Sequence, residues 1–141
     1  MMIDRNTGHL TFSLDKVVTQ TTTLADLKGF AFGEMQEERN LLNGWIHFVV
    51  KNVEMSGKYL NITFFFHQEA LNSVTFIINN SPFDLESGWG TWNEKEEREK
   101  VIFFTQWLEE QVGPARNFTW GHIWAAYDPL SGGSSIGIRY K

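Results

Sequence analysis

Four histidines are the residues in this sequence that could most readily bind a metal or act as a general base. No two of them lie two or four positions apart, and the chain contains neither an HExxH motif nor a paired-carboxylate motif. The absence of cysteine also excludes thiolate zinc sites and cysteine nucleophiles. We therefore expect no metal and no cofactor. The four histidines are His9, His47, His67 and His122.

The serine and glycine runs do not indicate hydrolysis or nucleotide binding. No GxSxG motif occurs, and the run from Ser131 to Ser135 is typical of a hairpin turn. Gly88-Trp89-Gly90 lacks the lysine and the serine or threonine of a P-loop. We therefore expect a protein that is not an enzyme.

Six tryptophans exceed what one small core needs, and tryptophan is enriched in interfaces and ligand clefts. Core packing is the simpler explanation for Trp107 and for one of Trp120 and Trp124. Carboxylates near a helix start are likewise favoured by the helix dipole, by a few tenths of a kcal/mol each. Tryptophans and glutamates nevertheless lie together beside flexible glycines, and this combination also predicts a surface for a basic protein partner. The residues of this predicted surface are Trp89, Trp92, Glu94, Glu96, Glu97 and Glu99.

A different set of aromatic residues favours an alternative function, a small-ligand site or an enzyme on one face of a sheet. Such a face would combine apolar rings with a few titratable groups, as ligand pockets do. Its residues would be Trp45, His47, Tyr59, Phe65 and His67.

Composition limits the classes of partner. Hydrophobic residues make up 42% of the 141 residues, which is too much apolar surface for a disordered chain. The net charge of −5 lacks the broad positive field of a nucleic-acid-binding protein. No apolar run reaches the roughly 20 residues that cross a bilayer, and the first residues do not form a secretory signal. We expect no nucleic acid, no membrane and a cytoplasmic location. A second acidic group, Glu34, Glu37 and Glu38, is expected in a surface loop.

The pattern along the chain predicts a single α+β domain over residues 1–141. An N-terminal hairpin turns at Arg5 to Gly8, with Leu10, Phe12 and Leu14 on its buried face. A short helix from Leu24 to Lys28 should begin at a capping box of Thr23 and Asp26 and stop at Gly29.

Three further strands between residues 44 and 80 form a predicted antiparallel meander. In the middle strand, Leu60, Ile62, Phe64 and Phe66 alternate with polar or aromatic neighbours, so they should face the core. A long helix from Glu94 to Val112 follows, with i,i+4 pairs of Glu94 with Arg98 and of Glu96 with Lys100. A C-terminal hairpin from Phe118 to Tyr140 completes the mostly antiparallel sheet.

Taken whole, the chain resembles the small immunity proteins that bacteria encode beside polymorphic or contact-dependent toxins. The resemblance lies in a short acidic α+β build without cysteine, with Gly88-Trp89-Gly90-Thr91-Trp92 before the helix and Trp120-Gly121-His122 opening the hairpin. Such proteins bind a toxin stoichiometrically and mask it. The resemblance implies a protein partner and no reaction.

Overall fold

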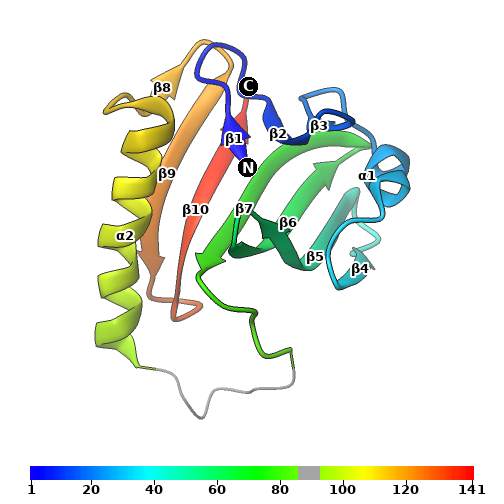
Figure 1. Cartoon of the computed structure of the whole chain (residues 1–141). Helices are drawn as coiled ribbons and strands as arrows, with labels where there is room; N and C mark the ends of the chain where they lie inside the picture. Colours follow the sequence, from blue (N-terminus) through cyan, green and yellow to red (C-terminus); the bar gives the residue numbers. More distant parts are fainter. Residues whose placement is uncertain (86–92) are drawn as a thin grey trace.

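A seven-stranded antiparallel sheet forms the centre of the computed structural model, which describes residues 1–85 and 93–141. Its strands follow the order β4-β5-β6-β7-β10-β9-β8, so the C-terminal hairpin adds to the meander through pairing of β10 with β7 (Figure 1). The bounds are β4 (Met35–Asn40), β5 (Trp45–Met55), β6 (Lys58–His67), β7 (Ala70–Asn79), β8 (Asn117–Phe118), β9 (Gly121–Asp128) and β10 (Gly133–Tyr140). The fold class is α+β, as the sequence predicts.

The long helix α2 (Glu94–Val112) has the predicted bounds and packs against β9 and β10. It begins at Asn93, whose side chain accepts a hydrogen bond from the Glu96 backbone N–H. It ends at Gly113, which has a φ of 76° that glycine adopts without steric cost. The charged pairing differs from the prediction in part. Lys100 pairs with Glu97 rather than with Glu96, whereas Glu94 does pair with Arg98.

The N-terminal strands form a separate small sheet of β1 (Met2–Ile3), β2 (Leu10–Ser13) and β3 (Lys16–Val18). The expected turn between residues 3 and 10 is present. Leu14, predicted to be buried, is fully exposed because the chain turns there into β3. The short helix α1 (Leu24–Phe30) has the predicted capping box, but it continues through Gly29 and stops at Ala31, which adopts the left-handed conformation.

Of the second acidic group, only Glu34 lies in an exposed loop as predicted. Glu37 and Glu38 belong to β4, an edge strand that pairs with β5. None of the six residues of β4 is buried, so the strand lacks the apolar alternation that would have revealed it. Its charged side chains also protect the exposed edge from pairing with another chain.

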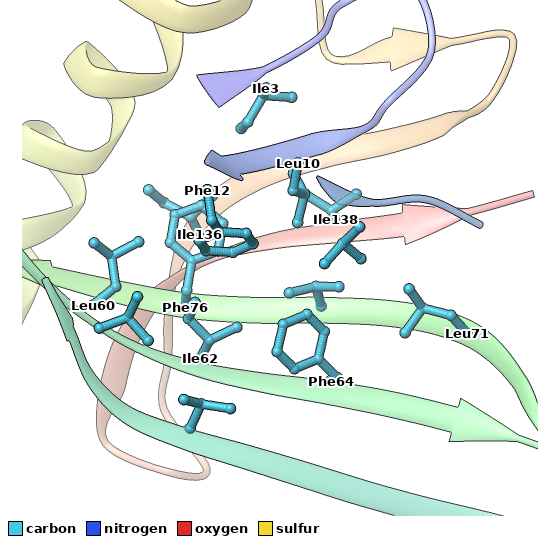
Figure 2. Close-up of a cluster of buried hydrophobic side chains, with 14 of the residues drawn as sticks. Ile3, Leu10, Phe12, Leu60, Ile62, Phe64, Leu71, Phe76, Ile136 and Ile138 are labelled. Atoms are coloured by element: carbon cyan, nitrogen blue, oxygen red, sulfur yellow. The ribbon is translucent and has the colours of Figure 1, made fainter. Parts of the chain in front are cut away.

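One face of the large sheet carries the core. Phe64, Phe66 and Phe76 are almost completely buried there, as predicted from alternation. Ile3 and Leu10 of the small sheet pack onto this face, as Figure 2 shows. Leu27 of α1 and the Phe104, Leu108 and Val112 stripe of α2 join the same cluster. All described helices and the small sheet therefore lie on the core face, and no described element covers the opposite face.

Candidate functional site

Two of the residues predicted to bind a partner, Trp89 and Trp92, lie outside the described residues. The four carboxylates of that surface lie in the first two turns of α2, and the structure separates them into two kinds. Glu94 and Glu97 are engaged within the protein. Glu96 and Glu99 are exposed, and their side chains make no hydrogen bond or ion pair with the residues that the structure describes.

The engaged carboxylates attach α2 to the C-terminal hairpin. Glu94 lies 3.6 Å from Arg98, whose guanidinium stacks 4.4 Å from the ring centre of Tyr127 in β9. The Glu97 carboxylate accepts a 3.2 Å hydrogen bond from the backbone N–H of Ser134 and forms an ion pair with Lys100 at 2.8 Å. The Ser134 hydroxyl donates to the backbone carbonyl of Glu97. Because only 17% of the Glu97 side chain is exposed, these contacts give it a structural role.

The free carboxylates line a cavity of about 580 Å³ between α2 and the end of β7. Its apolar lining includes Ile77 and Phe83, together with Phe103, which is 38% exposed. Glu96, Glu99 and Phe103 follow one another at i, i+3 and i+7, so they share one face of the helix. We call the region formed by Glu96, Glu99, Phe103, Ile77 and Phe83 the acidic groove.

Asn52 fixes the wall of the acidic groove that faces α2. It is buried, has a φ of 53° and lies in the bulge between Val50 and Val53. Its side chain accepts from the backbone N–H of Phe83 at 2.8 Å and donates to the Phe83 carbonyl at 3.0 Å. The Asn52 amide nitrogen also donates to the Glu34 carboxylate at 2.7 Å. One amide group thus pairs with the Phe83 backbone as a neighbouring strand would.

Positive charge also reaches the acidic groove. Lys58 lies 5.7 Å from the ring centre of Phe103 and donates to Asn80. Lys100 is already paired with Glu97. Glu96 and Glu99, which have no partner among the described residues, therefore lie on the outer rim, while Glu97 and Lys100 compensate each other and Lys58 contacts only neutral groups.

The alternative ligand face is only partly assembled. Trp45 stacks on His67 with centroids 4.6 Å apart, and His47 meets Phe65 edge-on at 4.6 Å. These pairs lie side by side on the uncovered face of β5 and β6. Tyr59 is six residues from Phe65 along β6, a separation of about 20 Å. It therefore does not join the other four residues, whose rings contact one another.

Sequence reasoning missed Phe103 and Asn52 as site residues. Phe103 lies off the apolar stripe of Phe104, Leu108 and Val112, and this offset is a signal of exposure that the sequence does contain. Asn52 carries no comparable signal, because its role depends on a bulge and on a residue 31 positions away.

Three further findings concern metal binding, membrane crossing and similarity to known proteins. Among the described residues, no three His, Asp or Glu side chains form a group that could hold a metal ion. No helix within residues 1–85 and 93–141 is long and apolar enough to cross a membrane. No family model, curated protein or solved structure matches the chain. The geometry of the acidic groove indicates what it can bind. Carboxylates that pair with none of the described residues, around an apolar floor, can bind a cationic, partly apolar group.

Proposed function

We propose that this chain is a non-enzymatic module that binds a basic protein at the acidic groove. The observation that carries the proposal is the position of Glu96 and Glu99, two exposed carboxylates that pair with none of the described residues and lie beside the half-exposed ring of Phe103. Carboxylates held for a structural purpose are paired, as Glu97 is. Carboxylates without such partners, beside exposed apolar surface, resemble the polar rim that surrounds the apolar centre of a protein interface.

The two parts of the acidic groove have different tasks in this proposal. The carboxylates attract a positively charged partner and accelerate its encounter. The apolar floor of Ile77, Phe83 and Phe103 then holds an inserted side chain, since buried aromatic contacts carry most of the binding energy at interfaces. A lysine or arginine with its long aliphatic stem fits both parts.

Stoichiometric masking of a toxin by an immunity protein is the biological setting we propose, based on the resemblance stated above. The net charge of −5 supports a basic partner. A toxin gene beside the coding sequence is the expected genomic context.

Site-specific photo-crosslinking tests the proposal. Benzoylphenylalanine in place of Phe103 exchanges one aromatic ring for another, and the same residue in place of Leu14, fully exposed in the β2–β3 turn, is the matched control. After irradiation in the native host, we expect one protein of net positive charge to be attached at position 103 and absent at position 14. Equal labelling at both positions, or an acidic protein at position 103, would contradict the proposal.

A further inference from the structure

A second charged cavity lies at the opposite end of β10. Its volume is about 480 Å³, and its lining contains no aspartate or glutamate side chain. The lining residues come from the ends of β8, β9 and β10 and from the start of β7. We call it the basic pocket and define it by its polar side chains: Asn72, Asn117, His122, Arg139 and Lys141.

Strand pairing places these side chains together. Arg139 lies opposite both Ser73 of β7 and His122 of β9, and His122 in turn lies opposite Asn117 of β8. Directly opposed residues in antiparallel strands share one face. Arg139, His122 and Asn117 therefore lie in one row on the uncovered face of the sheet.

Two contacts fix the ring of His122. Its Nδ1 lies 2.7 Å from Asn117 Oδ1, and since a carboxamide oxygen accepts, Nδ1 is the donor. The ring also stacks on Trp124 at 5.6 Å and 19°. With Nδ1 donating, Nε2 is an acceptor in the neutral ring and donates to an anion only in the protonated ring.

The positive charge of the basic pocket is uncompensated. The side chains of Arg139 and Lys141 form no ion pair with any acidic residue in the described part of the chain. Counted over its lining side chains, with histidine neutral, the pocket carries two positive charges and no negative one. This is unusual in a protein whose overall charge is −5.

We propose that the basic pocket binds the phosphate group of a small phosphate monoester. Arginine offers a planar fork that matches two phosphate oxygens, and lysine adds a point charge. The amides of Asn72 and Asn117 supply further donors. A phosphate monoester carries close to two negative charges at pH 7, twice the charge of a carboxylate. Phe118 also borders the pocket, but its ring is stacked on Trp120 and packs against the core, so the pocket offers mainly polar contacts.

Titration of the full chain by NMR tests this site with inorganic phosphate and with phenyl phosphate, against sodium chloride at equal ionic strength. We expect saturable shifts at the amides of residues 117, 122 and 139 with both phosphates. Shifts equal to those with chloride would overturn the proposal, since they would report only screening.

Variants distinguish binding in the basic pocket from attraction by the net charge of the protein. Arg139→Gln should weaken binding of phenyl phosphate about tenfold, the effect of losing one charge-assisted pair. Arg139→Lys keeps the charge, removes the fork and should weaken binding less. The matched control is Lys51→Gln, the same charge change three strands away on the same face, which should leave binding within about twofold. Folding of each variant is checked by its thermal melt. A folded Arg139→Gln protein that binds as the parent does would overturn the proposal, and that result would leave the acidic groove untouched.

Discussion

Strand β10 begins at the acidic groove and ends at the basic pocket, and the two regions use charge differently. Ser134 at its start is bonded to Glu97, so half of the charge around the groove stabilises the fold. Arg139 near its end has no acidic partner among the described residues. The comparison teaches that a cluster of charges indicates binding only after its internal pairs have been removed. Glu96 and Glu99 then remain at the groove, and Arg139 and Lys141 at the pocket.

Removing β10 would abolish both regions, and it is the largest change we predict. Truncation after Gln111 deletes β8, β9 and β10, including the buried Trp120, Ile123 and Ile136. The loss exceeds the 5 to 15 kcal/mol that stabilise a typical domain, so the product should be unfolded or aggregated. Circular dichroism during heating measures this. A cooperative melt near the temperature of the parent would show that the C-terminal strands are dispensable.

Asn52→Gly should damage the acidic groove and spare the basic pocket. Glycine accepts the φ of 53° but cannot pair with the Phe83 backbone, which leaves its partly buried N–H and C=O without that partner at a cost of about 1 kcal/mol. Urea unfolding measures the loss of stability. NMR shifts should be confined to residues near positions 34, 52 and 83. Equally large shifts at residues 117 and 139 would show that the two regions are coupled.

Tyr140, which lines the basic pocket, makes that end of the molecule sensitive to alkali. Burial raises the pKa of its phenol, and the hydroxyl donates to the Gly8 carbonyl at 2.9 Å. The stability contributed by the neutral phenol is complete below the pKa of an unfolded tyrosine, about 10, and decreases as pH rises above it. Tyr140→Phe should cost about 1 kcal/mol at pH 7. Its melting temperature should also decrease less between pH 9 and 11 than that of the parent. An identical decrease would contradict this assignment.

The two kinds of carboxylate in α2 should contribute differently to the free energy of unfolding, and this difference is the smallest effect we predict. Glu97→Gln weakens the bonds to Lys100 and Ser134 and should cost about 1 kcal/mol. Glu96→Gln removes no partner, so we expect a change within about 0.5 kcal/mol. Urea unfolding of both variants gives the comparison. Equal losses would remove the distinction between structural and free charge.

Local patterns predicted much of the fold. Alternation identified the core face of β6, and the helix expected from Glu94 to Val112 has these bounds in the structure. The edge strand β4 was missed because all its residues are polar or exposed, and pairing with β5 alone makes it a strand.

The candidate sites could be predicted only in part. The carboxylates of α2 were recognised, but the hydrogen bonds between Glu97 and Ser134 depend on the β9–β10 hairpin, which brings Ser134 to the helix. The basic pocket depends on strand order. Residues 72, 117, 122 and 139 meet because β10 pairs with both β7 and β9, and no spacing in the sequence encodes that order.

The central claim is that free carboxylates at the acidic groove attract a basic partner. Its most direct measurement is the association rate constant of the cross-linked partner, once purified, with Glu96→Gln/Glu99→Gln. The matched control is Glu69→Gln/Glu110→Gln, the same charge change on two exposed carboxylates outside the groove that pair with none of the described residues.

At low salt we expect the groove variant to associate roughly threefold to tenfold more slowly than the parent, with a weaker dependence on salt, and the control to differ by less than about twofold. Equal slowing in both variants would mean that only net charge matters. An unchanged rate in the groove variant would contradict the claim itself.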